Sequence, residues 1–274
     1  MRAVSVLGTM TLLVAIPLCF FASATPSVRH GIISSDETWQ GEIHVIGDIL
    51  IPAGVTLTIL PGTVVHIAAN QDVENLSPPD AWWMKEGVNW GENDYELAVF
   101  HGEPYRDEGH HISFFGEGTL HAVGTPEQMI LITSDSPTPT IWDWDLLGVE
   151  RGILSYCIIE YYRGLNSPMI SHCILRYVGE CAVCRQSGVV EYSSISYAGH
   201  ELIDTPDSSL IIRGNHLGPN PPGGITAGGG SPQIIDNIFE DCSTGIYLIA
   251  PPGPGMIMKG NVFRNCGTDI GHYY

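Results

Sequence analysis

Several carboxylates occur at spacings that could place them together. Asp143 and Asp145 are two residues apart, so a β-strand would present both side chains on one face. Two carboxylates on one face could bind calcium, which takes oxygen ligands. Asp236, Glu240 and Asp241 form another acidic group, and a third group, which could pair an acid with a base, contains His200, Glu201, Asp204 and Asp207. Because acidic clusters are more often solvated surface than sites, we expect no bound cofactor, and calcium at Asp143 and Asp145 is the alternative.

Aromatic side chains that could stack on sugar rings fall into three groups. These are Tyr156, His172 and Tyr192; Tyr161, Tyr177 and Tyr197; and Trp82, Trp83 and Trp90. The first two groups recur at fixed positions of a repeated phrase, so their rings should stack in columns. Such columns could lie inside the fold, which is the commoner arrangement, or form an external platform for an extended polysaccharide. The tryptophans could likewise anchor a loop to the scaffold instead of binding sugar.

The repeated phrase is an apolar residue, two variable residues, a small residue (Asn, Ser or Cys), a variable residue and an apolar residue. It occurs six times, with the small residue at Cys157, Cys173, Ser193, Asn215, Asn237 and Asn261. The steps between these positions are 16, 20, 22, 22 and 24 residues. Such a period is too short for repeats of paired helices and indicates a solenoid of shorter elements.

The segments around each small residue are typical of strands. Runs such as "IIRGN", "QIIDNIF" and "MIMKGNVF" are short and rich in β-branched residues. Between them stand "GPNPPGG", "AGGGSP" and "APPGPG", in which no helix would persist. The Leu-x-x-Leu-x-Leu phrase of leucine-rich repeats is missing. The sequence therefore predicts an all-β solenoid in which each turn buries its apolar faces against the next.

The six repeats resemble the coils of the right-handed parallel β-helix family, which has the pectate-lyase-like fold. In that family a small polar residue, often Asn, stacks from coil to coil and hydrogen-bonds the backbone, and Asn215, Asn237 and Asn261 match that ladder. The resemblance extends to residues 40–67 and to "GEGTLHAVGTPEQMILITSDS" followed by "WDW". It implies one right-handed parallel β-helix domain of about nine or ten coils over residues 25–274.

The family includes lyases, hydrolases and epimerases that act on acidic polysaccharides with clustered carboxylates, often with calcium. Their Asp-Asp and Gly-His-Gly phrases are absent from this sequence, so no catalytic residue is carried over from the resemblance. Because one solenoid supports many activities, the resemblance predicts a fold rather than a function.

The charge balance narrows the choice of partners. The chain has 30 Asp and Glu against 11 Lys and Arg, which gives a formal net charge of −19. Nucleic acids and anionic membranes bind basic patches, so we expect neither as a partner. A polyanion such as pectate would also be repelled unless calcium bridged it to the protein.

Residues 1–24 have the pattern of a Sec-type signal peptide. Arg2 precedes the apolar run "VSVLGTMTLLVAIPLCFF", and "ASA" at 22–24 supplies small residues for cleavage after Ala24. An uncleaved membrane anchor is the alternative. We therefore expect a secreted or extracytoplasmic protein that begins near Thr25 and has no membrane segment after cleavage.

Residues 68–111 interrupt the repeat. This insert is acidic and contains the three tryptophans. Long loops on a rigid scaffold are often functional, so the insert is a candidate for part of a site.

Six cysteines would remain after cleavage: Cys157, Cys173, Cys181, Cys184, Cys242 and Cys266. Neighbouring coils lie about 4.8 Å apart, a separation that a disulfide tolerates, so Cys157–Cys173 and Cys242–Cys266 could be bridged. We expect buried free thiols instead. The "CAVC" phrase at 181–184 could be a local disulfide or half of a metal site, but no second pair of Cys or His has ligand spacing nearby.

Two functions remain. We expect a non-catalytic exported protein that is structural or binds a polysaccharide, a cell-surface component or another macromolecule along its side. The alternative is a carbohydrate-active enzyme, a polysaccharide lyase or glycoside hydrolase, acting on a solenoid face beside the insert. The chain stops soon after its last coil, so that coil could also make an end-to-end contact with another protein.

Overall fold

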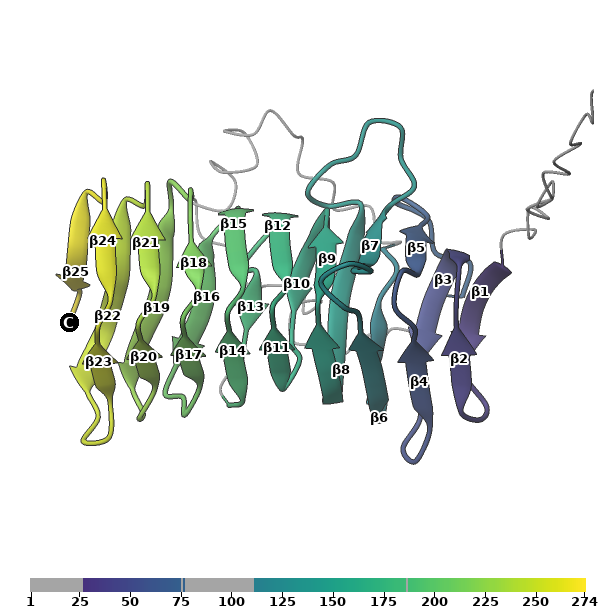
Figure 1. Ribbon diagram of the computed structural model, residues 1–274, viewed down its shortest axis with the longest axis horizontal. Coiled ribbons are helices and arrows are strands. Elements are labelled where there is room, and N and C mark those ends of the chain that lie inside the picture. Colours follow the sequence, from purple (N-terminus) through teal and green to yellow (C-terminus); the bar gives the residue numbers. More distant parts are fainter. Residues whose placement is uncertain (1–26, 75, 77–110, 186) are drawn as a thin grey trace, which may run out of the picture.

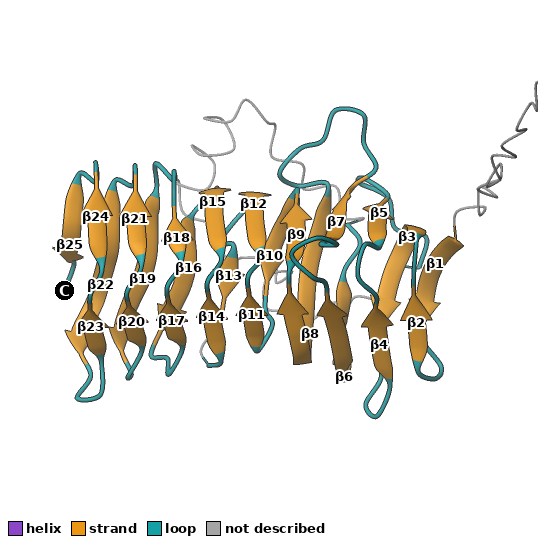
Figure 2. Cartoon of the chain, in the orientation of Figure 1, coloured by secondary structure: helices purple, strands orange, loops and turns teal. Residues whose placement is uncertain are grey.

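The computed structural model describes residues 27–74, 76, 111–185 and 187–274. Within these ranges all regular elements are strands, which confirms the all-β prediction (Figure 2). None of the described residues forms a helix that could span a membrane. The expected signal peptide at 1–24 and residues 77–110 of the insert lie outside the described ranges.

The strands stack side by side in three rows along the molecule (Figure 1). The first row contains β2 (Glu37–Trp39), β4 (Thr56–Ile59), β6 (Phe114–Val123), β8 (Trp144–Ser155), β11 (Met169–Ser171), β14 (Val189–Glu191), β17 (Ile211–Arg213), β20 (Gln233–Ile235) and β23 (Ile257–Lys259). The second row contains β1 (Ser27–Ile32), β3 (Glu42–Leu50), β5 (Val64–Ile67), β7 (Ile130–Ser134), β9 (Cys157–Glu160), β12 (Ile174–Val178), β15 (Ser194–Ala198), β18 (His216–Leu217), β21 (Ile238–Glu240) and β24 (Val262–Arg264). The third row continues from the long strands β1, β3, β6 and β8 through β10 (Tyr162–Leu165), and then as a separate sheet of β13 (Val183–Cys184), β16 (Glu201–Pro206), β19 (Gly223–Gly229), β22 (Thr244–Pro252) and β25 (Thr268–His272).

Long strands explain why most of these elements form one sheet. The strands β3, β6 and β8 turn from one row into another, and so 20 strands are joined in one hydrogen-bonded sheet and five in a second. All the strand pairings are parallel and join strands of neighbouring repeats. This arrangement is compatible with a parallel β-solenoid.

The register confirms the repeat that the sequence predicts. In the first row Leu154 pairs with Ile170, and the same position continues through Val190, Ile212, Ile234 and Met258. The first step, which is the shortest, therefore follows the same register as the later ones. These apolar side chains point inward and, up to Ile234, are fully buried, so each repeat extends one continuous core.

The asparagine ladder forms at the interior bend between the first two rows. Asn237 Nδ2 donates to the Ile212 carbonyl at 2.9 Å, and its Oδ1 accepts from the Asn215 backbone amide at 3.0 Å. Asn261 holds Asn237 in the same way, and Ser193 and Cys173 continue the column towards the N-terminus. Each asparagine pairs a backbone amide and a carbonyl of the preceding repeat, so the ladder adds to the backbone hydrogen bonds that already join neighbouring bends.

The described cysteines are free thiols. Cys157, Cys173, Cys181 and Cys242 are buried, while Cys184 and Cys266 are partly exposed. Cys242 shares its interior column with Tyr162, Val178, Ala198 and Asn220, all of which are fully buried. These side chains therefore fill the core beside the second bend.

Candidate ligand-binding face

Two bends in each repeat place aromatic residues in the left-handed backbone conformation. The first bend precedes the second-row strand and the second lies near its end. Positive φ occurs at Tyr156 (51°), His172 (55°), Tyr192 (49°), Tyr161 (62°), Tyr177 (59°) and Tyr197 (56°). At such a residue the chain changes direction, so neighbouring side chains leave on opposite sides. Tyr161 therefore points outward, while Tyr162 is fully buried.

The same bends in later repeats carry residues that adopt this conformation more easily. The first bend has Gly214, Asp236 and Gly260, and the second has Asp241 and Asn265, all with positive φ. The left-handed conformation brings no steric penalty for glycine and a small one for Asn or Asp. For an ordinary L-residue it is unfavourable by about 1–2 kcal/mol. Tyrosine at these bends is therefore held in an unfavourable backbone conformation.

The aromatic residues form two stacked columns. In the second-bend column, the Tyr161 and Tyr177 ring centroids are 5.2 Å apart with planes 12° from parallel, and Tyr177 and Tyr197 are 5.5 Å apart. In the first-bend column, Tyr156 and His172 are 4.7 Å apart, and His172 and Tyr192 are 5.3 Å apart. Both columns thus form ladders along the direction in which repeats stack.

The columns lie on the outside of the molecule. Tyr192 is 53% exposed and Tyr197 is 38% exposed, and the remaining rings are partly exposed or, at His172, exposed. The interior arrangement, which is the commoner one for such ladders, is therefore wrong for both columns. We call the surface between them the outer panel; it comprises residues 156–161, 172–177 and 192–197, on β9, β12 and β15.

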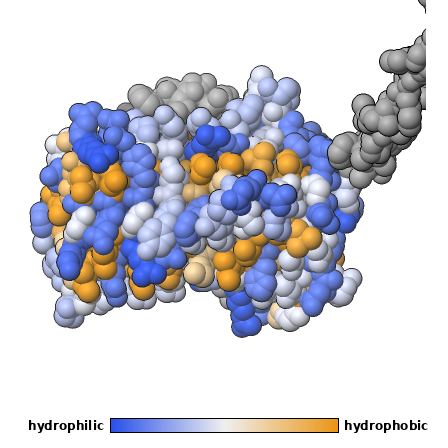
Figure 3. All heavy atoms as spheres, viewed as in Figure 1, coloured by the Kyte–Doolittle hydropathy of each residue, from blue (hydrophilic) through white to orange (hydrophobic). Residues whose placement is uncertain are grey.

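The floor of the outer panel is formed by the outward side chains of these three strands. Ile158, Ile174 and Ser194 form one line, and Glu160, Arg176 and Ser196 form the next. Arg176 pairs with Glu160 at 2.5 Å and lies 5.4 Å from the Tyr177 ring centroid. Hydrophobic residues appear between hydrophilic ones on this side of the molecule (Figure 3). The panel therefore combines apolar area with a neutralised charge pair.

The stacking decides which ring atoms are available. Because neighbouring rings face one another, their flat faces are largely occupied within the column, and their edges and hydroxyl groups face solvent. Burial, and next the negative charge of Glu160, raise the pKa of the Tyr161 phenol above its ordinary value. It therefore stays protonated at neutral pH and can both donate and accept hydrogen bonds. A ligand would therefore contact the hydroxyl groups of the tyrosine column rather than the faces of its rings.

A second ion pair lies beside the first bend. Glu191 accepts from Arg213 Nε at 2.7 Å, and Ser171 lies next to both Glu191 and His172. Glu240 and Arg264 occupy the positions that Glu160 and Arg176 hold in earlier repeats, but Glu240 pairs with a different residue. These residues are register neighbours, but Glu240 contacts His216 on the preceding repeat at 2.8 Å. The strand register therefore does not determine which neighbouring repeat the Glu240 side chain contacts.

The carboxylates proposed for calcium have protein partners. Asp143 is 1% exposed and accepts hydrogen bonds from the Ser134 hydroxyl and from the Thr140 amide and hydroxyl. Asp145 is 4% exposed and lies 3.3 Å from the Ser113 hydroxyl and 3.5 Å from Arg163. This geometry adds no support for calcium. It also places the Asp145–Arg163 pair in a buried setting rather than an open cleft.

The structure unites two groups that the sequence keeps apart. Cys181 Sγ lies 3.2 Å from His200 Nδ1, and Glu201 Oε2 contacts the same nitrogen. Hydrogen bonding to Cys184 and burial raise the pKa of the Cys181 thiol well above its usual range, so this thiol is not an activated nucleophile. The parallel pairing of β13 with β16 sets Cys184 opposite Asp204. The same register brings Cys181 close to His200 and Glu201.

Some predicted residues lie outside the structure and some site residues were not predicted. Trp82, Trp83 and Trp90 fall outside the described residues, and their role stays a prediction. Ile158 and Ile174, on the panel floor, were missed although each stands one position after a small residue of the repeat. This position, one residue after the small residue, could have identified them as outward-facing side chains.

No protein-family model matches the chain, and no curated protein or solved structure shows significant similarity to it.

Proposed function

We propose that this protein is an exported, right-handed parallel β-helix of about nine or ten coils that binds an extended neutral glycan along the outer panel without transforming it. The single observation that carries this proposal is the presence of tyrosine at strained, outward-facing bends of three successive repeats. Later repeats use Gly, Asp and Asn at the same bends, except that Pro219 lies opposite Tyr197.

The energetic cost of these tyrosines supports a role for their exposed groups. Stacking between neighbouring rings contributes about 0.5–1.5 kcal/mol per pair, which offsets much of the strain. It does not require the hydroxyl groups, since phenylalanine would stack equally well. The three tyrosine hydroxyl groups of the second-bend column, together with the polar groups of Tyr156, His172 and Tyr192, offer hydrogen bonds to a ligand. Clustered exposed aromatics are typical of interaction surfaces.

The spacing of the panel favours an extended ligand. Its groups repeat every 4.7–5.5 Å along the column, as the ring centroids do. A polymer aligned with the stacking direction would meet a tyrosine of the second-bend column at each of the three repeats, and the apolar Ile158 and Ile174 at two of them. A compact ligand would use one repeat and gain nothing from the others.

The electrostatics of the panel favour a neutral ligand. Arg176 neutralises Glu160, so the floor contributes little net charge. The chain as a whole carries −19, which repels a polyanion at low ionic strength. A neutral polysaccharide avoids this repulsion and can still accept and donate hydrogen bonds.

The alternative is a polysaccharide lyase or glycoside hydrolase. Such an enzyme needs two carboxylates, or a carboxylate and a base, that converge on an open site. In the outer panel the carboxylate of Glu160 is held by Arg176 and by Thr133 Oγ1, which leaves it poorly placed to act on a substrate. We therefore favour binding over catalysis.

Affinity gel electrophoresis tests the proposal. Soluble neutral polysaccharides (a β-glucan, a xylan and a galactomannan) and polygalacturonate are compared with and without calcium, and reducing ends are assayed in parallel. We expect retardation by a neutral polymer, no new reducing ends, and loss of retardation in Tyr177→Asn. Tyr274→Ala is the matched control, because Tyr274 is 59% exposed and lies outside the panel.

Three results would overturn the proposal. If no polymer retards the wild-type chain, the glycan function fails. If retardation persists in Tyr177→Asn, the ligand binds elsewhere. New reducing ends would instead establish the enzymatic alternative.

A further inference from the structure

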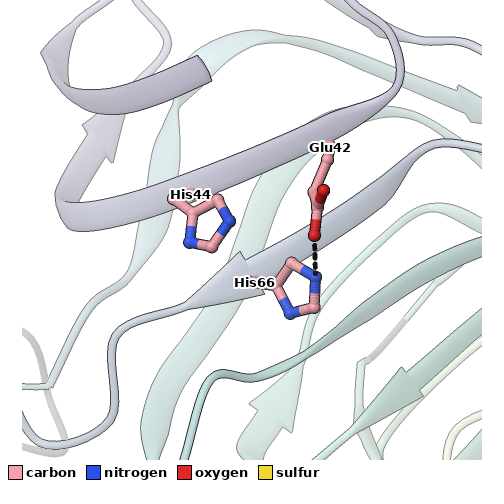
Figure 4. A group of neighbouring side chains, drawn as sticks. All are labelled: Glu42, His44 and His66. Atoms are coloured by element: carbon pink, nitrogen blue, oxygen red, sulfur yellow. Dashed lines mark ion pairs between the residues drawn. The ribbon is translucent and has the colours of Figure 1, made fainter. Parts of the chain in front are cut away.

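Three potential metal ligands project from one face of two neighbouring strands, at the opposite end of the second row from β24. Glu42 and His44 are two residues apart on β3, so both side chains leave on the same side. His66 on β5 pairs in register with His44. Figure 4 shows the three side chains together, with Glu42 extending towards His66. The parallel register therefore creates a set that no local sequence motif contains.

The donor atoms of these side chains converge. One donor atom from each residue lies within 4.8 Å of the other two. Glu42 Oε1 is 3.4 Å from His66 Nε2, and the His44 and His66 ring centroids are 5.0 Å apart with planes 29° from parallel. Zinc–nitrogen bonds are about 2.0–2.1 Å long, so small side-chain rotations would bring the set to coordination distance. The Glu42 side chain is 57% exposed and is free to make that rotation.

His44 provides a second, independent observation. Its Nε2 atom is buried and has no hydrogen-bond partner among the described residues. A buried polar nitrogen without a partner costs about 1–3 kcal/mol, so such atoms usually have an unseen partner. A cation bound in the plane of the His44 ring, at Nε2, would satisfy this nitrogen.

We infer that Glu42, His44 and His66 form a binding site for a transition-metal dication of the zinc class. Two imidazoles and one carboxylate suit zinc, nickel or copper, whereas calcium and magnesium prefer oxygen ligands throughout. Three protein ligands leave a coordination position for water, and the ligands stand on two rigid strands. The bound ion would link β3 to β5 and stabilise this end of the sheet, because binding to the folded state alone raises its stability.

Other histidines that the structure describes lack this arrangement and serve as controls for the proposed site. His121 lies on β6, is exposed, and pairs in register with Thr58 rather than with a histidine. His30 contacts a carboxylate, Glu74, without a second imidazole. Cys181, His200 and Glu201 form another convergent set, but this one contains a thiol. Each alternative can therefore be separated from the proposed site by variant or by spectrum.

The test is metal titration of the full chain after treatment with a chelator. Zn²⁺ binding is measured by competition with a chromophoric indicator, in wild type and in His44→Ala, His66→Ala, Glu42→Gln and His121→Ala. We expect His44→Ala and His66→Ala each to weaken one Zn²⁺ site at least about ten-fold, since even outer-shell partners of metal ligands contribute 10–100-fold. His121→Ala should bind as wild type does, and Zn²⁺ should raise the melting temperature of wild type but not of His66→Ala.

Cobalt substitution identifies which set is occupied. Co²⁺ bound to Glu42, His44 and His66 should show ligand-field absorbance without a thiolate charge-transfer band. The inference is overturned if wild type binds no Zn²⁺, if His44→Ala and His66→Ala bind it with unchanged affinity, or if the Co²⁺ spectrum is thiolate-dominated and lost in Cys181→Ser. Because the three side chains lie on the outer face, the metal-free variants should still fold. If a histidine variant does not fold, Glu42→Gln decides the question, since it should also weaken Zn²⁺ binding.

Discussion

The carboxylate of Asp48 on β3 accepts a hydrogen bond from the backbone amide of Ser113 at 2.8 Å, across 65 residues of chain. The second oxygen of Asp48 accepts from the Leu76 amide, also at 2.8 Å. The residues on both sides of 77–110 are therefore fastened to one buried side chain. Asp48 is fully buried, so it acts as a structural anchor for the insert.

We expect Asp48→Ala to lower the free energy of unfolding by about 2–4 kcal/mol, because it leaves two amides without their acceptor in a buried setting. Urea denaturation of the variant checks this. Asp36→Ala is the control, since Asp36 accepts a single hydrogen bond from the Thr56 amide in an exposed position. Its cost should stay below about 1 kcal/mol. Equal losses in both variants would contradict the anchoring role.

Asn237 is the central member of the described asparagine ladder, and it should be among the most costly polar side chains to remove. Asn237→Ala leaves the Asn215 amide and the Ile212 carbonyl without side-chain partners. We expect the free energy of unfolding to fall by about 2–4 kcal/mol. Asn265→Ala, which changes an exposed bend residue, is the comparison. A loss in Asn237→Ala no larger than that in Asn265→Ala would disprove the ladder's importance.

The left-handed bend at Tyr177 predicts an unusual order of substitutions. Asn tolerates this conformation, so Tyr177→Asn should relieve strain while it loses two ring contacts, and its stability should change by less than about 1 kcal/mol. Valine is β-branched and fits the bend poorly, so Tyr177→Val should be less stable than Tyr177→Asn by about 1–2 kcal/mol. Chemical denaturation of both variants measures the difference. Equal stabilities would show that the bend relaxes around the side chain.

Burial raises the pKa of the Cys242 thiol to about 12, and this shift predicts a dependence of stability on pH. The unfolded thiol ionises near its ordinary value of about 8.5, while the folded one stays protonated. The contribution is therefore fully present below about pH 8.5 and is lost as the pH rises towards 12. Between pH 8.5 and 10.5 the unfolding free energy of wild type should fall more steeply than that of Cys242→Ala. Parallel slopes for the two proteins would refute this assignment.

The sequence by itself determined the repeat and the core. Apolar residues at one position of each phrase, from Leu154 to Met258, specify inward-facing strands, because burial of one side chain per repeat requires register between repeats. The Asn ladder was predictable for the same reason, since a polar side chain at a buried bend needs backbone partners. The strands, their parallel pairing and the columns of aromatic residues all follow from this local periodicity.

Only the tertiary structure decided which surface side chains face outward and which residues they contact. Whether the Tyr161, Tyr177 and Tyr197 rings face inward or outward depends on left-handed bends, which the residue types do not specify. The meeting of Glu42 and His44 with His66, and of Cys181 with His200, depends on the register between repeats of unequal length. Surface side chains are not constrained by burial, so their partners are set by where the folded strands bring them rather than by the pattern that folds those strands.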